Sequence, residues 1–211
     1  IVTYTLVNED YIRNAYLPVG EPIALAMPMS DARRYVRTSL INSVLECVQY
    51  NEAHQSTDNC FYEISHVYGK GASEERLAVA LDGSLMKDRL HKLEIQGDFY
   101  AMKGILTAWL ERCGFQDARI QVKENTADTV HFHPYRSAEL WLDKTMLGVF
   151  GEIHPEFAAK FDLKHVVYAE MKMQPVLETK TGKVRFEAVD RYPSVSRDIA
   201  LVVSGGVSAK E

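Results

Sequence analysis

The sequence has few cysteines and no long apolar run. Its three cysteines, Cys47, Cys60 and Cys113, form no Cys-x-x-Cys pair, and an odd number argues against a disulfide framework. Each has apolar residues nearby, so we expect buried, inert thiols inside a cell. No apolar run approaches the roughly 20 residues that span a bilayer, and the first residues do not resemble a signal peptide. We therefore expect a cytoplasmic protein without a membrane segment.

Positive charge is also scarce over most of the chain. The formal net charge is -5. Residues 179–211 hold six Lys or Arg and four Asp or Glu, a net charge of +2, which leaves -7 for the rest. Nucleic acids are bound mainly through Lys and Arg, so the acidic body is a poor surface for an RNA backbone. If RNA contacts this protein, the tail is the expected place.

The length and composition fit one large core with a small extra unit. The chain has 211 residues, of which 46% are hydrophobic, and it does not begin with methionine, so we expect an excised piece of a longer protein. We expect a core over residues 1–173. Residues 174–184 are polar, with Pro175 and Gly182, and are expected to form a linker. Residues 185–211 are expected to begin a second, truncated domain, with a strand at 199–203.

Two helices are indicated by apolar periodicity. The first is expected to start at Ser30 as N-cap, with a stripe formed by Val36, Leu40, Val44 and Val48. The second is expected to start at Asp98 and to end before Gly114. Its apolar stripe comprises Phe99, Met102, Ile105, Leu106, Trp109, Leu110 and Cys113.

The remaining pattern is mainly one of strands. Residues 60–68 carry apolar groups on both faces, which indicates an inner strand, and residues 76–81 are expected to be its hairpin partner. Further strands are expected at 118–123, 138–142, 146–150 and 166–173. Hairpin-linked strands with two long covering helices predict an α+β fold with a mainly antiparallel sheet.

Six runs along the chain carry a family resemblance. They are Pro28-Met29-Ser30 with Val36-Arg37-Thr38-Ser39-Leu40; Phe61-Tyr62-Glu63-Ile64; Gly97-Asp98-Phe99-Tyr100-Ala101-Met102-Lys103-Gly104; Phe132-His133-Pro134 with Arg136-Ser137-Ala138; Gly151-Glu152-Ile153-His154-Pro155; and residues 192–201. Together the chain resembles the beta subunit of bacterial phenylalanine–tRNA ligases. Met27, Ser65 and Tyr135 depart from that pattern, where Asn, Gly and Gly are expected.

The resemblance implies both a fold and partners. The fold is that of a class II aminoacyl-tRNA synthetase core, followed by the first strand of a ferredoxin-like anticodon-binding domain. The implied partners are a catalytic alpha subunit, in an assembly of two alpha and two beta chains, and tRNA(Phe). ATP and magnesium belong to the whole enzyme by this resemblance. We expect no cofactor in this piece, and the family's editing site lies N-terminal to it.

The residues that a class II active site needs are missing from the expected places. Such a site holds ATP with Arg side chains and holds metal ions with carboxylates. After the strand at 63–68 come Gly69, Lys70 and Gly71, which instead describe a hairpin turn. No glycine-rich run ending in Arg follows Pro155. We therefore expect a catalytically silent scaffold with no catalytic or cofactor-binding residue.

Two alternatives remain open. His131, His133, Glu152 and His154 form a His-x-His and a Glu-x-His pair, which could hold a metal ion in a metal-dependent hydrolase. Pro follows His133 and His154, which favours structural roles for both. The other alternative is a free-standing regulatory paralogue of class II synthetases, which would differ only in what it binds.

Five residues are candidates for structural or interface roles: Arg37, Glu63, Asp98, Lys103 and Arg136. Arg37 is expected beside the apolar stripe of the first helix, paired with an acid such as Glu63 or with the alpha subunit; a solvated Arg is the alternative. A buried Glu63 would need such a partner. Gly104 is expected to let another element approach closely. We also expect an exposed apolar patch where the partner docks.

Overall fold

The chain is built around a six-stranded antiparallel sheet. The computed structural model describes residues 1–182, 193, 195–200 and 202. The strand order is β3-β4-β10-β9-β8-β7, and every neighbouring pair is antiparallel. The strands are Asn59–Gly69 (β3), Ala72–Asp82 (β4), Ile120–Glu124 (β7), Phe132–Leu142 (β8), Thr145–Ile153 (β9) and Val166–Lys172 (β10). The predicted α+β fold with a mainly antiparallel sheet is confirmed.

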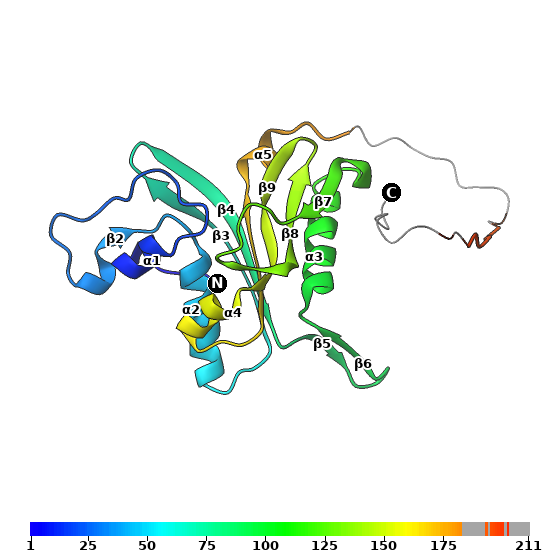
Figure 1. Ribbon diagram of the computed structural model, residues 1–211, viewed down its shortest axis with the longest axis horizontal. Helices are drawn as coiled ribbons and strands as arrows, with labels where there is room; N and C mark the ends of the chain where they lie inside the picture. Colours follow the sequence, from blue (N-terminus) through cyan, green and yellow to red (C-terminus); the bar gives the residue numbers. More distant parts are fainter. Residues whose placement is uncertain (183–192, 194, 201, 203–211) are drawn as a thin grey trace.

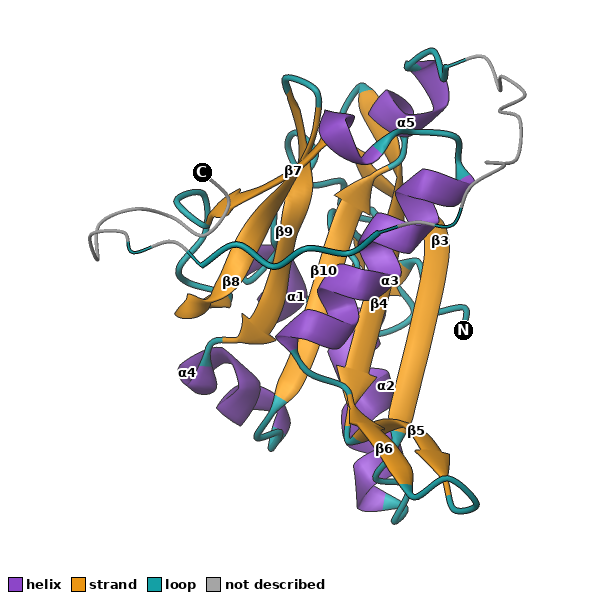
Figure 2. Ribbon diagram, turned by 90° about the vertical axis from the view of Figure 1, so that its right-hand side faces the viewer, coloured by secondary structure: helices purple, strands orange, loops and turns teal. Residues whose placement is uncertain are grey.

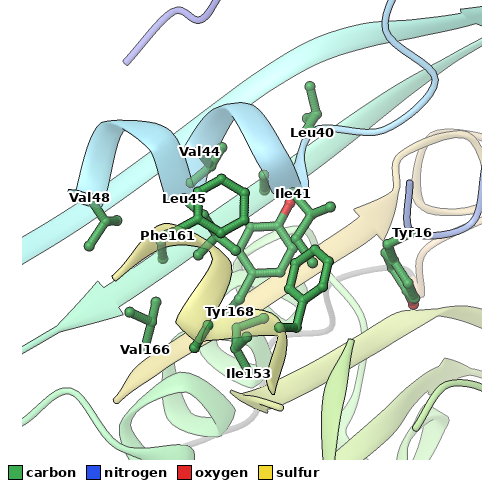
Figure 3. Close-up of a cluster of buried hydrophobic side chains, with 14 of the residues drawn as sticks. Tyr16, Leu40, Ile41, Val44, Leu45, Val48, Ile153, Phe161, Val166 and Tyr168 are labelled. Carbon is green, nitrogen blue, oxygen red and sulfur yellow. The ribbon is translucent and has the colours of Figure 1, made fainter. Parts of the chain in front are cut away.

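One face of the sheet is covered by helix α2, Ile41–Ala53, and by the segment before it. Figure 3 shows apolar side chains of α2 gathered around Tyr168 of β10, with Phe161 and Ile153 beside them. The elements before α2 are β1 (Leu6–Val7), α1 (Glu9–Arg13), η1 (Asp31–Arg33) and β2 (Tyr35–Val36). Two later elements, α4 (Pro155–Ala158) and η3 (Ala159–Phe161), pack into the core of this face through Phe157 and Phe161. Pro155 occupies the first turn of α4, as its fixed φ favours and as the sequence predicts.

The other face is covered by α3, Phe99–Arg112, and by the short α5, Gln174–Glu178. Figure 2 shows α3 lying over the sheet. The buried residues of α3 are Met102, Leu106 and Leu110, so the predicted stripe is confirmed at its centre. The Oδ1 atom of Asp98 accepts a hydrogen bond from the backbone N–H of Ala101 at 2.8 Å, which caps the helix as predicted.

Smaller elements complete the described chain. β5 (Ser84–Asp88) and β6 (Leu93–Gln96) form a hairpin that projects away from the large sheet (Figure 1). η2 (Asp117–Arg119) precedes β7, and α5 lies within the segment expected to be a linker. Leu201 and Val203, from the strand expected at 199–203, lie outside the described residues. No helix among the described residues is long and apolar enough to cross a membrane.

The first long helix begins eleven residues later than Ser30, so that boundary is wrong. Asp31–Arg33 forms a 3-10 turn, and the Ser30 side chain makes no capping hydrogen bond. Val36 belongs to β2, where it pairs with Leu6 of β1. The apolar spacing was helical over the whole stretch, but strand pairing with a distant segment overrides local periodicity.

The strand at 60–68 forms as predicted, but its position as an inner strand is wrong. β3 is the outermost strand on its side of the sheet. Tyr62 is 65% exposed and Ile64 is 48% exposed, because α3 does not reach this strand. β3 therefore has apolar side chains on both faces because one face is an exposed apolar surface. A central, buried position in the sheet is not the reason.

The expectation of buried thiols is also wrong. Cys60 and Cys113 are exposed, and Cys47 is half-buried. Cys60 points to the uncovered face of β3, and Cys113 is the C-cap of α3, beyond the part that packs on the sheet. Gly104 is likewise in the open, because a Cβ placed there would meet no described atom within 4 Å. Among the described residues no second element approaches it.

Two deeply buried charges join the neighbouring inner strands β4 and β10 to the N-terminal segment. Arg76 on β4 donates from Nη1 to Oε1 of Glu170 on β10 at 2.7 Å, and both side chains are buried. Arg76 also donates to the carbonyls of Tyr16 and Leu17, at 3.3 and 2.6 Å. Besides the guanidinium of Arg76, three groups donate hydrogen bonds to the Glu170 carboxylate. They are the backbone N–H of Leu40 and the hydroxyls of Ser39 and Tyr168.

This network leaves one polar atom without a described partner, the Nε of Arg76. The charge of Glu170 holds the pKa of Arg76 above its ordinary value, although burial alone would lower it. Burial raises the pKa of Tyr168 well above its ordinary value, and the adjacent Glu170 charge adds to this. Arg76 is therefore charged, and Tyr168 keeps its proton to donate.

Removing one partner of this buried pair is expected to destabilise the fold strongly. We predict that Arg76→Met lowers the free energy of unfolding by about 3–5 kcal/mol, because it leaves Glu170 buried and unpaired. Urea unfolding followed by tryptophan fluorescence measures this. The exposed pair of Lys70 and Glu21 provides the control: Lys70→Ala should cost less than about 1 kcal/mol. If both substitutions lowered the free energy of unfolding equally, the Arg76–Glu170 pair would not be a major contributor to stability.

Candidate functional site

The turn between β3 and β4 lies where the sequence suggested a lost phosphate site. Only Lys70 and Gly71 separate the two strands, and Gly71 has a φ of 73°, which a tight hairpin turn requires. The Lys70 ammonium is exposed and pairs with Oε2 of Glu21 at 3.0 Å. The turn thus offers only the Lys70 ammonium, which is paired with Glu21. It has no arginine, whose planar guanidinium donors would hold a triphosphate.

Arg37 and Glu63 form the buried ion pair that the sequence suggested. Nη1 of Arg37 lies 3.0 Å from Oε1 of Glu63, and both side chains are almost fully buried. Thr3 donates its hydroxyl to Oε2 of Glu63 at 2.8 Å, and Arg37 donates from Nε to the carbonyl of His66 at 3.0 Å. Arg37 follows β2 and is not on the long helix. The pair fastens the N-terminal segment to the edge strand β3.

The histidines of the metal alternative do not meet. His131 is buried, with Nδ1 at 2.6 Å from Oδ2 of Asp128 and Nε2 at 3.2 Å from the carbonyl of Asn14. Nδ1 of His154 accepts from the backbone N–H of Glu156 at 3.3 Å, as the N-cap of α4.

His133 serves a local turn. Its Nδ1 accepts from the backbone N–H of Tyr135 at 3.1 Å, and its Nε2 lies 3.2 Å from Nη2 of Arg136. In the part of the chain that the structure describes, no group of three or more His, Cys, Asp or Glu side chains could hold a metal ion. The candidate metal ligands therefore do not converge on one point. Each makes its own hydrogen bonds or ion pairs: His131, His133, Glu152 and His154.

Three of the runs that carry the resemblance meet in one cleft. It has a volume of about 400 Å³ and lies where the start of α3 faces the ends of β9 and β10. Glu152 forms its charged centre: Oε2 lies 2.7 Å from Nη1 of Arg136, and Oε1 lies 3.1 Å from Nδ1 of His165. Its lining residues are Gly97, Asp98, Phe99, Tyr100, Tyr135, Arg136, Glu152, His165 and Val167.

A second hollow is almost wholly apolar. It has a volume of about 270 Å³ and lies between α3 and the uncovered face of β3. Tyr62 and Ile64 line it from β3, and Ile105 and Trp109 line it from α3. We call this surface, with Cys60, Phe61, Leu77, Val79 and Leu106, the apolar groove. The exposed apolar patch expected from the sequence is present here.

The sequence analysis does not predict several residues of the cleft and of the buried ion pair. His165 and Tyr100 of the cleft were not singled out, since neither belongs to a short motif with a known chemistry. Arg76 and Glu170 were missed too, although a charged residue inside an apolar strand was a usable signal. Lys103 is exposed on α3, and its interface role stays a prediction.

The pair of Asp128 and His131 makes a pH-dependent contribution to stability. Burial alone would raise the pKa of Asp128, but hydrogen bonds from the ring and backbone of His131 and from the backbone of Val130 hold it below its ordinary value. A carboxyl with a lowered pKa stabilises the fold above its ordinary pKa of about 3.9, and this contribution is lost as the pH falls through the folded-state pKa.

We predict that Asp128→Asn lowers the free energy of unfolding by about 1.5–3 kcal/mol at neutral pH, because a charged acceptor is lost. The difference from the parent chain should shrink as the pH falls below the ordinary carboxyl pKa. Urea unfolding over a pH series measures both values. The exposed Glu124→Gln serves as the control, with little effect at any pH. A difference that persists unchanged in acid would contradict this role.

Comparison with known proteins identifies the family. Residues 1–173 match the family described as phenylalanyl tRNA synthetase beta chain CLM domain. The chain is 38% identical over 214 residues to a phenylalanine–tRNA ligase beta subunit of Geobacillus kaustophilus, covering 99% of this chain and 26% of that protein. It is 32% identical over 216 residues to that of Staphylococcus epidermidis, covering 100% and 26%. The chain thus spans about a quarter of the length of these relatives.

The fold is similar to that of solved synthetases. A pyrrolysyl tRNA synthetase of Desulfitobacterium hafniense superposes with a TM-score of 0.60 at 13% identity, covering 84% of this chain and 60% of that one. This likeness shows the fold alone, which is that of a class II aminoacyl-tRNA synthetase, as the resemblance implied. With the family match over most of its length, the chain belongs to the phenylalanyl tRNA synthetase beta chain CLM domain family.

Proposed function

We propose that this chain is a catalytically silent core of the beta subunit of a phenylalanine–tRNA ligase. It serves as a scaffold for the alpha subunit and helps to position tRNA(Phe) during aminoacylation. The observation that carries the proposal is the combination of a class II fold with the β3–β4 turn, where Lys70 is engaged with Glu21 and no arginine stands. The chain keeps the class II fold, but the turn that would carry phosphate-binding arginines is a short hairpin turn without them.

The family match supports a proposal about the wider assembly. We propose two alpha and two beta chains in the cytoplasm, with ATP and magnesium bound outside this chain. The residues here do not fit an ATP–magnesium site. The described acids Glu63 and Glu170 are both consumed by buried arginines, and no described group of three acidic or histidine side chains could hold a metal.

The proposed surface for the alpha subunit is the apolar groove. Its side chains come from β3, β4 and α3; the two strands pair in the sheet, and α3 packs on the core of that face. Exposed apolar surface is unfavourable in water by roughly 25 cal/mol per Å², so burial against a second chain stabilises the assembly. Contiguous apolar patches on a folded domain typically mark protein–protein contacts.

A silent core should show no adenylation activity. We predict that the purified chain gives no ATP–pyrophosphate exchange with phenylalanine above the rate without protein, because a site without its preorganised donors loses at least about a hundredfold for each donor removed. The complete enzyme, with its alpha subunit, is the positive control. Clear exchange by this chain alone would overturn the proposal.

Charge placed in the apolar groove should prevent assembly. We predict that Ile64→Asp removes co-purification with the matching alpha subunit, since a carboxylate would have to be buried without a partner. Val130→Asp, at an apolar residue outside the groove that is 71% exposed, should leave co-purification intact. Circular dichroism of both variants checks that the fold is retained. Undiminished binding by Ile64→Asp would refute the groove as the docking surface.

The same co-expression separates the remaining alternatives. A free-standing regulatory paralogue would not bind the alpha subunit at all, even with an unaltered groove. The metal-dependent hydrolase has no supporting observation, because His131, His133 and His154 are engaged in separate places.

A further inference from the structure

A polar hollow lies on the face of the sheet opposite α3, where α1, α2 and η3 meet. Its volume of about 480 Å³ falls within the range of small-molecule sites, roughly 300–1,000 Å³. It shares no lining residue with the apolar groove or with the cleft at the start of α3, and the scaffold role does not use it. We call it the amide hollow, because four side-chain amides line it: Asn8, Asn14, Asn42 and Gln49.

One of these amides is buried and has an oxygen without a partner. Asn42 on α2 is only 3% exposed. Its Nδ2 donates to the carbonyl of Tyr11 at 3.1 Å and to that of Asn14 at 3.0 Å, which uses both of its hydrogens. Its Oδ1 accepts from no described residue, and it is not among the enclosed unpaired atoms, which are on Thr38 and Arg76. This oxygen is therefore open to the hollow, and an amide oxygen in such a place requires a donor.

Three further polar groups line the same hollow. Gln49 lies two turns after Asn42 on the same side of α2, and its amide makes no hydrogen bond with a described residue. Lys160 donates from Nζ to Oδ1 of Asn14 at 2.7 Å and keeps two hydrogens. The side chain of Asp10 on α1 has no ion-pair partner in the part of the chain that the structure describes. The hollow thus offers donors and acceptors side by side.

The apolar part of the hollow is a pair of aromatic rings. The rings of Tyr11 on α1 and Phe161 on η3 have their centroids 6.2 Å apart and are tilted by 52°. Phe161 is 6% exposed and belongs to the core of this face, so its position is fixed by packing. The C–H groups of a ligand ring would pack on this pair.

This combination of groups selects a class of ligand. Asn42 and Asp10 accept hydrogen bonds, Lys160 donates them, and Gln49 does both. A hydroxyl group donates one hydrogen bond and accepts others, so a ring with several hydroxyls satisfies all of these groups together. One ammonium group beside one carboxylate leaves no net charge to favour an ionic ligand.

We propose that the amide hollow binds a neutral sugar, as a mono- or disaccharide. The hydroxyls of the sugar bond to the free polar groups of the hollow, and its C–H groups pack against Tyr11 and Phe161. The inference goes beyond the scaffold role and does not depend on it, since every contact comes from this chain.

Isothermal titration calorimetry of the whole 211-residue chain tests this with D-glucose, D-galactose, D-mannose and maltose. We expect saturable one-to-one binding of at least one of these sugars. Cyclohexanol has a ring of similar size with a single hydroxyl, and it should bind at least about tenfold more weakly than the best sugar, since it leaves most of the polar groups unpaired. Equal affinity for cyclohexanol would overturn the assignment of a sugar. Tighter binding of adenosine than of any free sugar would also overturn it.

Substitutions locate the site. Gln49→Ala and Asp10→Ala should each weaken binding of the best sugar about tenfold, because each removes hydrogen bonds to hydroxyls. Gln96→Ala, at an exposed glutamine on β6, should not change it. Saturation-transfer NMR on the sugar gives a second measurement, and circular dichroism confirms that each variant is folded. No saturable binding of any of the four sugars at tens of millimolar, or binding unaffected by both substitutions in the hollow, would overturn the proposal. Neither result bears on binding of the alpha subunit.

Discussion

The fold depends on one buried ion pair, between Arg76 of β4 and Glu170 of β10. These strands are neighbours inside the sheet, and each partner also binds the segment that covers it. Arg76 donates to the carbonyls of Tyr16 and Leu17, and Glu170 accepts from the backbone N–H of Leu40, just before α2. A buried pair of this kind gains little over apolar packing, but it specifies one arrangement strictly, since any other leaves a charge unpaired. The pair thereby fixes where the N-terminal segment crosses the sheet.

The same logic extends to the edge of the sheet and explains the exposed surfaces. Arg37 and Glu63 fasten the N-terminal segment to β3 on one face, and α3 covers only the strands further in on the other face. The outer face of β3 is left bare, which creates the apolar groove. In the proposed scaffold role, this apolar surface is available to a partner while the core of the chain stays covered.

Much of the fold could be predicted from the sequence, because local signals were strong where they agreed with tertiary packing. Asp98 predicted the start of α3 and Gly114 its end, and Asp143 and Lys144 predicted the β8–β9 turn. The start of α2 could not be predicted: Val36 fits a helical stripe, but its pairing with Leu6 depends on contacts thirty residues away. The edge position of β3 and the exposure of Cys60 and Cys113 depend on which strands α3 covers, which periodicity does not encode. The cleft shows the same limit, since Arg136, Glu152 and His165 meet only through strand register.

The central claim is that this core is a silent scaffold whose apolar groove receives the alpha subunit. Hydrogen–deuterium exchange of the chain, with and without the matching alpha subunit, tests it most directly. The account predicts that amides of β3 around Tyr62 and of α3 around Trp109 become strongly protected in the complex. A complex that forms with protection only elsewhere, leaving both groove elements exchanging at their free rates, would contradict it.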